Sequence, residues 1–248
     1  MQIGVNFARV AGVTMASPIT TTTCKKHRLF PLNYNPTRSI AIDARSVLHL
    51  PEVPISIWKD KVVFVRADFN VKYETDPSSQ TSADGIPALR VKNTSLKRVT
   101  ETVPTLRHLL DAGARVVVTA HFSDPKEEDL ASPVTRAQNS LRPVAAALSH
   151  ELGQPVQFAD DCIGDKVRAA VEALAPKNIL LLENLRFYKG EKKNDEKFVD
   201  QLLQAIKPDA YVNDAFGTGM FSTSIFFFFF FFFFFSFFFL NNFEQQHE

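Results

Sequence analysis

The sequence predicts an α/β fold in which helices cover both faces of a parallel sheet. Short runs of β-branched and aromatic residues recur from residue 62 onward, which is typical of strands buried on both faces. Segments with the apolar spacing of amphipathic helices separate these runs, and strands that alternate with helices form parallel sheets. Gly113 and Gly153 follow two of the helical segments, where a glycine commonly ends a helix.

The first strand and the first helix are expected between residues 62 and 112. Residues 62–65 (VVFV) form the strand, and a polar loop rich in Ser, Asp and Gly follows to residue 94. In residues 95–112 leucine and valine recur every three or four positions, which predicts an amphipathic helix.

The same alternation continues to residue 213. The further strands expected are residues 115–122, 156–159, 179–182 and 210–213, and the further helices are residues 140–152, 165–174 and 194–206, the last with Asn194 as its N-cap. Right-handed crossovers join parallel strands, and ligands bind at the carboxyl ends of such strands. Four segments are therefore expected to meet at one edge of the sheet, which we call the rim: residues 66–70, 120–122, 183–186 and 213–216.

Charge and cysteine content argue against several function classes. The net charge is +1, so no overall field attracts nucleic acid or an anionic membrane, and neither is expected as a partner. Cys24 and Cys162 are too few for a disulfide framework and lack the spacing of zinc ligands. This cysteine usage fits a reducing compartment.

Residues 1–45 are expected to lie outside the folded domain. Residues 1–42 contain no Asp or Glu but include basic residues and many Ser and Thr, a composition typical of organelle transit peptides. We therefore predict targeting to a plastid or mitochondrion. One alternative is a disordered extension. Another is a start codon placed too far upstream, with Met15 as the true start. Either alternative would leave the protein in the cytoplasm.

A series of strings resembles the N-terminal substrate-binding domain of phosphoglycerate kinase. They are VFVRADFNV (63–71), SLRPVA (140–145), FADDCIG (158–164), LLLENLRFY (180–188) and NDAFGT (213–218). The resemblance implies a Rossmann-like domain over residues 46–218. It also implies reversible phosphoryl transfer between ATP and 3-phosphoglycerate, giving 1,3-bisphosphoglycerate in glycolysis or carbon fixation, by a monomer that uses ATP or ADP with Mg²⁺.

The resemblance also implies a substrate loop directly after the first strand. Asp68 and Asn70 would bind the hydroxyl and carboxylate end of 3-phosphoglycerate, and Phe69 lies between them in the same binding loop. Arg66, at the base of this loop, would support it.

Three further basic residues are implied as site residues. His121 and Arg186 would bind the 3-phosphate, since guanidinium groups bind phosphate in a bidentate way. Arg98 would be the catalytic residue, because it would stabilise the charge on the transferring group.

The sequence departs from the family pattern at two places. Asp124 stands where a phosphate-binding arginine is expected, which leaves Lys126 as a candidate replacement cation. After residue 218 the match ends, and no stretch corresponds to the nucleotide-binding domain or offers a glycine-rich phosphate loop. As written, the chain is therefore expected to be an incomplete form that binds neither nucleotide nor metal and has no activity.

Residues 219–248 form a tail unrelated to the family. It contains ten consecutive phenylalanines at residues 226–235, which predicts aggregation. Its 16-residue apolar segment, residues 225–240, is shorter than the ~20 residues of a spanning helix, so a membrane anchor is the less favoured hypothesis. Translation into an intron would produce such a tail, and a recently acquired low-complexity segment is the alternative.

Two functional alternatives remain for the chain. One is an enzyme represented by an incomplete chain, and the other is a non-catalytic module that binds phosphoglycerate or a partner.

Overall fold

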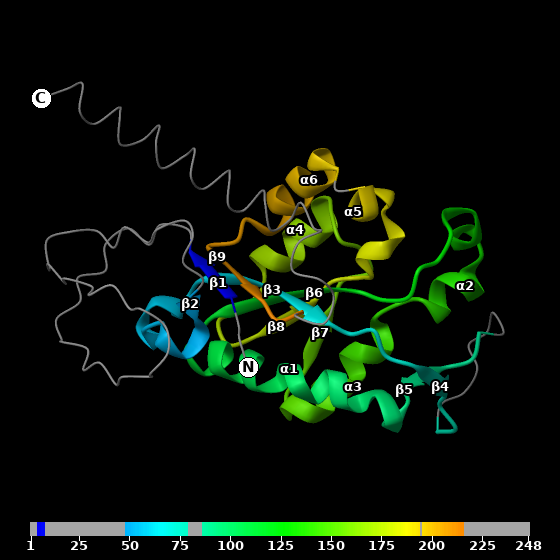
Figure 1. The fold of residues 1–248 in the computed structure, drawn as a ribbon, viewed down its shortest axis with the longest axis horizontal. Helices are drawn as coiled ribbons and strands as arrows, with labels where there is room; N and C mark the ends of the chain where they lie inside the picture. The colour runs from blue at the N-terminus through cyan, green and yellow to red at the C-terminus, as the bar shows by residue number, and fades with distance from the viewer. Residues whose placement is uncertain (1–3, 8–47, 79–85, 194, 216–248) are drawn as a thin grey trace, which may run out of the picture.

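The computed structural model describes residues 4–7, 48–78, 86–193 and 195–215, and helices lie on both sides of a central sheet (Figure 1). The strands are β1 (Gly4–Phe7), β2 (Leu48–His49), β3 (Val62–Asp68), β4 (Tyr73–Thr75), β5 (Leu89–Val91), β6 (Arg115–His121), β7 (Val156–Phe158), β8 (Ile179–Leu181) and β9 (Ala210–Asn213). The α-helices are α1 (Leu96–Asp111), α2 (Pro133–Gln138), α3 (Arg142–Leu152), α4 (Asp165–Glu172), α5 (Lys189–Lys193) and α6 (Glu196–Ile206).

The five strands expected from the sequence are parallel neighbours in the order β9-β3-β6-β8-β7. This arrangement confirms the predicted α/β fold class. β3 and β6 are the central and longest pair, and they are in register along their whole length, from Val62 opposite Arg115 to Asp68 opposite His121. All five strands point the same way, so their carboxyl ends lie at one edge of the sheet, as predicted for the rim.

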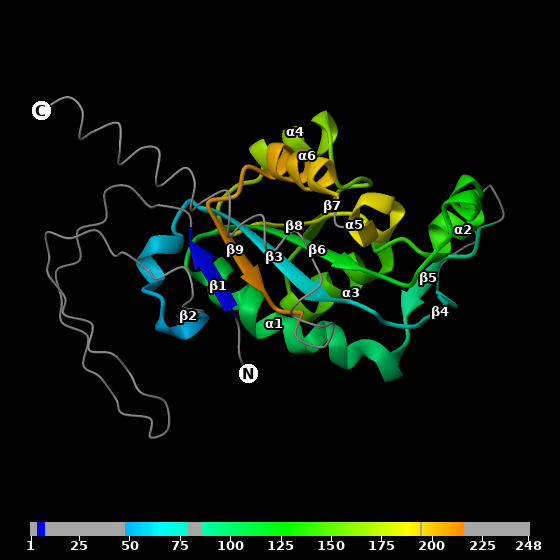
Figure 2. The same cartoon turned by 45° about the horizontal axis from the view of Figure 1, so that its top comes forward.

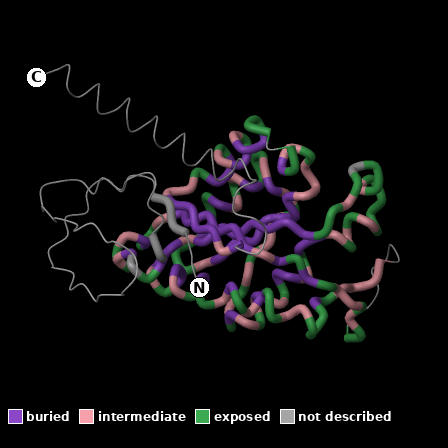
Figure 3. The backbone as a smooth tube through the Cα atoms, in the orientation of Figure 1, coloured by how far each residue is buried: buried purple, intermediate pink, exposed green. Residues whose placement is uncertain are grey.

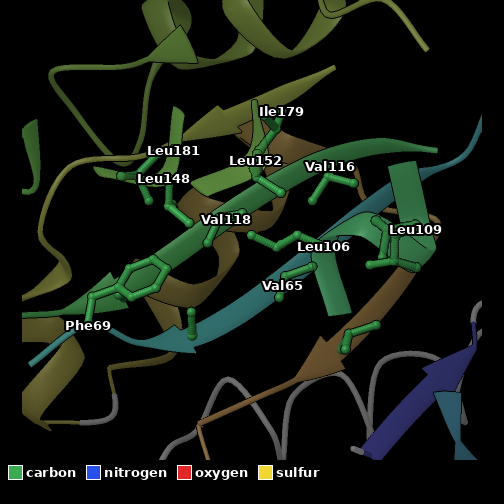
Figure 4. Close-up of a cluster of buried hydrophobic side chains, with 14 of the residues drawn as sticks. Val65, Phe69, Leu106, Leu109, Val116, Val118, Leu148, Leu152, Ile179 and Leu181 are labelled. Atoms are coloured by element: carbon green, nitrogen blue, oxygen red, sulfur yellow. The ribbon is translucent and has the colours of Figure 1, made fainter. Parts of the chain in front are cut away.

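Helices α1 and α3 cover one face of the sheet. Alternate residues of β3 and β6, such as Val65 and Val118, point into this core and pack with Leu106 of α1 and Leu148 of α3 (Figure 4). All four side chains are fully buried. α1 and α3 end before Gly113 and Gly153, and both glycines have positive φ angles, as the sequence predicted.

Helices α4 and α6 cover the opposite face. The intervening residues of the same strands, Phe64 and Val117, pack there with Val167 of α4 and Leu202 of α6. The view in Figure 2 separates these helices from α1 and α3. Both sheet faces are therefore buried, and Figure 3 shows the central strands as the most continuously buried part of the chain.

The loop expected between the first strand and the first helix contains a hairpin. β4 and β5 pair antiparallel as a separate two-stranded sheet. The Tyr73 hydroxyl donates a 2.8 Å hydrogen bond to the Ser140 carbonyl, and its ring lies 4.6 Å from that of Phe122, between centroids. The pKa of Tyr73 is raised well above its usual value by burial and by the Glu183 carboxylate. The hairpin thus packs against the start of α3 and the end of β6.

The N-cap of the last helix lies one residue later than predicted. Its N-cap is Asp195, whose carboxylate accepts a 3.0 Å hydrogen bond from the Lys197 amide, so the prediction of Asn194 as the cap is wrong. The two residues are adjacent and both are good caps, and sequence alone does not separate them.

A strand also forms within the stretch that we expected to lie outside the folded domain. β1 pairs antiparallel with β9, from Gly4 opposite Asn213 to Phe7 opposite Ala210, and β2 pairs with β1. Without this pairing β9 would be an edge strand with unpaired backbone groups, which readily accept another strand. Four residues are too few to show a strand period, so this strand was not predicted.

Within the described parts of the chain, no helix combines the length and the apolar character needed to cross a membrane. The expectations for the tail, including aggregation and the anchor alternative, concern residues outside those described.

Candidate functional site

The rim brings the carboxyl ends of three central strands together. Asp68, the last residue of β3, lies opposite His121, the last residue of β6, and Arg66 lies opposite Asn213 in β9. The Asp214 amide donates a 2.8 Å hydrogen bond to the Arg66 carbonyl, which extends the ladder by one residue. Residues more than 140 positions apart in the sequence therefore meet at one site.

Arg98 reaches the rim from the first turn of α1. Its Nη1 lies 2.5 Å from Oδ2 of Asp68, and the other carboxylate oxygen of Asp68 accepts a 3.1 Å hydrogen bond from the Asn70 amide. Asn70 itself is exposed. The Arg98 side chain is 49% exposed, so it can contact a ligand while it remains paired with Asp68. The implied catalytic residue and the implied substrate loop are thus in contact.

Arg66 and Arg186 share one buried carboxylate. Glu191 of α5 lies 3.6 Å from Nη2 of Arg66 and 3.1 Å from Nη1 of Arg186, and its side chain is only 2% exposed. A buried carboxylate needs such partners, because an unpaired charge in the interior is costly. Glu191 therefore fixes two guanidinium groups of the rim relative to each other.

His121 lies beside these guanidinium groups in a buried position. Burial is the main cause that lowers its pKa, and the positive charges of Arg66 and Arg186 lower it further. Its Nδ1 atom is buried and has no hydrogen-bond partner among the described residues. The imidazole is therefore neutral near pH 7, and a negatively charged ligand beside it would favour its protonation.

Asn184 connects the loops that follow β6 and β8. Its side-chain oxygen accepts hydrogen bonds from the amides of Phe122 (2.9 Å) and Arg186 (3.0 Å). Its side-chain nitrogen donates to the carbonyls of Phe122 (2.7 Å) and Asn139 (2.9 Å). Asn184 is fully buried. It thus sets the position of the Arg186 backbone relative to the residue after His121.

Glu183 anchors the start of α3 to the same loop. It accepts hydrogen bonds from the Ser140 hydroxyl (2.8 Å) and from the amides of Leu141 (2.9 Å) and Asn184 (2.8 Å). Sequence reasoning gave no individual role to Glu183, Asn184 or Glu191. The one available signal was that Glu183 and Asn184 come shortly after the apolar strand Ile179–Leu181. Both are among the few polar residues that are buried.

The loop after β6 carries the predicted departure from the family pattern. Asp124 forms an ion pair with Lys192 of α5, and both side chains are partly exposed. Lys126, the replacement cation suggested by the sequence, lies 3.8 Å from Glu128 instead. Ser123 adopts a φ of 54°, a left-handed conformation that is uncommon for residues other than glycine.

Phe69 lies in the core, apart from the charged groups of the rim. Its side chain is fully buried and packs in the core beneath α1 and α3 (Figure 4). The resemblance implied substrate binding by this loop as a whole, but strand alternation sends Phe69 inward while Asp68 and Asn70 face the rim.

Asp214 directly follows β9 at the rim, and its pKa is raised above the usual value of an aspartate. Burial raises its pKa to about 7, with a further rise from Glu101 and an opposing effect of the Thr105 hydroxyl. This raised pKa brings the titration of the carboxyl group toward the neutral pH range.

The rim suits a small ligand with several negative charges. The guanidinium groups of Arg66, Arg98 and Arg186 converge on it. In the described segments no group of three or more His, Cys, Asp or Glu residues could hold a metal ion. The glycines described there are also isolated rather than gathered in a phosphate-binding loop.

Comparisons with known proteins agree in pointing to one family. Residues 55–224 match the family model described as "Phosphoglycerate kinase". The chain is 39% identical over 170 residues to the phosphoglycerate kinase of Wolbachia, which covers 68% of this chain and 37% of that protein. It is 44% identical over 158 residues to the phosphoglycerate kinase of Brucella melitensis, a match that covers 64% of this chain and 34% of that protein. The chain thus spans about a third of the length of these relatives.

Among solved structures, phosphoglycerate kinase from Coxiella burnetii aligns at 26% identity with a TM-score of 0.42, covering 59% of this chain and 31% of that one. The enzyme from Pyrococcus horikoshii aligns at 27% identity with the same TM-score, covering 61% and 32%.

Proposed function

Because the chain belongs to the phosphoglycerate kinase family, we propose that its rim is the binding site for 3-phosphoglycerate. The observation that carries this proposal is the convergence of three arginines and His121 on the carboxyl ends of β3, β6 and β8. A ligand with both a phosphate and a carboxylate requires several such donors, since arginine binds both groups in a bidentate way.

The roles of the individual residues follow from their positions. Arg186 and His121 bind the 3-phosphate, and Arg66 supports them through Glu191. Asp68 and Asn70 orient the glycerate end, and Arg98 stabilises charge on the carboxylate oxygen that takes part in phosphoryl transfer. Phosphoryl transfer depends on such positioning and charge neutralisation more than on covalent catalysis.

The reaction of the family is reversible transfer between ATP and 3-phosphoglycerate, with Mg²⁺. We infer that residues 1–248, purified alone, bind the acceptor without turnover, because the described glycines are not gathered in a phosphate-binding loop for the nucleotide. A coupled kinase assay checks this, and turnover above the rate without protein would contradict it. A module that binds phosphoglycerate without catalysis is the second candidate function, favoured by the same observation.

Titration calorimetry with 3-phosphoglycerate tests the site. Arg98→Gln and Arg186→Gln should each weaken binding about tenfold or more, the effect of losing a charge-assisted hydrogen bond. Arg107→Gln is the matched control, because Arg107 is on α1 like Arg98 but donates to the Glu151 carbonyl, 2.9 Å away on α3. Equal affinities for Arg98→Gln and Arg107→Gln would contradict the assignment of Arg98.

We also propose that the protein is directed to a plastid or mitochondrion, with the cytoplasm as the alternative. The support is the acid-free, basic composition of residues 1–42. Fusing residues 1–45 to a fluorescent protein tests this, and diffuse cytoplasmic fluorescence would contradict it.

A further inference from the structure

We propose that Lys192 supplies the phosphate-binding cation that the loop after β6 lacks, and that Asp124 competes with the ligand for this cation. The inference rests on the proposed function, since it assigns one more residue to the same site. It is carried by the ion pair between Lys192 of α5 and Asp124 of the loop after β6.

The path of the loop places Asp124 beside the rim. It lies three residues after His121, and Asn184 pins the intervening Phe122 through both its amide and its carbonyl. Ser123 then turns the chain with a φ of 54°. A carboxylate at this place repels an anionic ligand, so Asp124 cannot itself bind phosphate.

The attachment of α5 places Lys192 beside the same site. The preceding residue, Glu191, forms ion pairs with Arg66 and Arg186, so the helix is fixed to two rim guanidinium groups. The ammonium group of Lys192 extends from α5 to Asp124. The cation expected from the loop is therefore provided by the helix that faces it.

The ion pair leaves Lys192 available to a ligand. Its side chain is 42% exposed and that of Asp124 is 63% exposed. Exposed ion pairs contribute little to stability, so a phosphate can replace or join Asp124 as the partner of the ammonium group. An ammonium group has three donors and can contact both at once.

Lys126 provides a matched control. It is two residues from Asp124, and its Nζ lies 3.8 Å from Oε1 of Glu128. The two side chains are 76% and 77% exposed. Both lysines carry the same charge, so they differ in position and not in chemistry.

The test is calorimetric titration of the full 248-residue chain with 3-phosphoglycerate at two salt concentrations. Lys192→Met should weaken binding about tenfold and reduce its salt dependence, while Lys126→Met should leave both unchanged. Asp124→Asn should tighten binding about two- to fivefold, because it removes a repulsive charge. The double exchange Asp124→Lys with Lys192→Asp should bind within about threefold of the wild type, since it returns a cation to the loop.

Two outcomes would overturn the inference. One is Lys192→Met binding as tightly as Lys126→Met. The other is Asp124→Asn weakening binding as much as Lys192→Met, because the pair would then act only as a structural link. If the wild type binds and Arg186→Gln abolishes binding while Lys192→Met does not, only this inference fails. If the wild type does not bind 3-phosphoglycerate, the proposed function fails with it.

Discussion

At the scale of single residues, Asn184 contributes most to the arrangement of the rim. It makes four hydrogen bonds to backbone groups of three residues, Phe122, Asn139 and Arg186, and it is fully buried. Phe122 directly follows the proposed phosphate ligand His121, and Arg186 is itself a proposed phosphate ligand. A single side chain therefore links the stability of the domain to the geometry of the site.

Replacing Asn184 by alanine should lower the free energy of unfolding by about 3 kcal/mol or more, since each buried backbone group left unpaired costs about 1–3 kcal/mol. Urea unfolding measures this. Asn139→Ala is the control, because its side chain makes only a 2.8 Å hydrogen bond to the Thr135 carbonyl and should cost about 1 kcal/mol. Equal losses in the two variants would contradict the role given to Asn184.

His121 should make stability depend on pH. Its pKa in the folded protein is lowered by burial and by Arg66 and Arg186, so between the two pKa values the unfolded chain binds a proton that the folded chain does not. The free energy of unfolding should therefore fall as the pH drops below 6.5, the ordinary value, toward the folded pKa. His121→Gln should remove this part of the decrease. Unfolding curves at pH 5.5 and 8 that change equally in both proteins would contradict it.

Sequence could predict the residues that end strands but not the residues that hold them. Asp68, His121 and Arg186 lie within four residues after apolar runs, so their meeting at the rim was predictable. Glu191 and Lys192 belong to a charged stretch that resembles a solvated helix, and only the fold brings them to Arg66 and Asp124. The separation of these partners along the chain explains why their pairing could not be predicted.

At the scale of elements, the short helix α5 carries Glu191 and packs closely against α6. Gly190 lies in this five-residue helix, and a Cβ atom there would be 2.5 Å from Cβ of Phe198 in α6. Such a contact requires one helix to move. The close approach explains a glycine at this position, next to the carboxylate that pairs with two arginines.

Gly190→Ala should therefore destabilise the protein by about 1–3 kcal/mol and weaken binding of 3-phosphoglycerate, because Glu191 moves with the helix. Thermal unfolding and calorimetry measure the two effects. Lys193→Ala changes an exposed residue of the same helix and should alter neither. A Gly190→Ala protein with wild-type stability and affinity would show that α5 adjusts freely.

The longer elements were predictable because burial on one or both faces imposes a regular pattern. The boundaries of β6, α4 and β9 agree with the sequence to within two residues. The hairpin β4–β5 and the strand β1 were missed, since strands of three or four residues are too short for a period and depend on contacts with distant backbone.

At the scale of the whole molecule, the described domain favours solubility and the tail opposes it. The domain buries its apolar residues in two cores, one on each side of the sheet. Residues 226–235 add ten consecutive phenylalanines without a charge. A run of this kind favours self-association of the chain.

Light scattering should accordingly find the 248-residue chain aggregated, and deletion of residues 220–248 should give a soluble monomer with the circular dichroism of an α/β protein. A monodisperse monomer of the full chain would contradict this. Unchanged aggregation after the deletion would place its cause in another part of the chain.

The central claim is that the rim is the phosphoglycerate site, and a crystal structure of the protein soaked with 3-phosphoglycerate tests it most directly. We expect the phosphate between Arg186, His121 and Lys192, with the glycerate end beside Asp68 and Arg98. Density for the ligand at any other surface, or an empty rim at a saturating concentration, would contradict the claim.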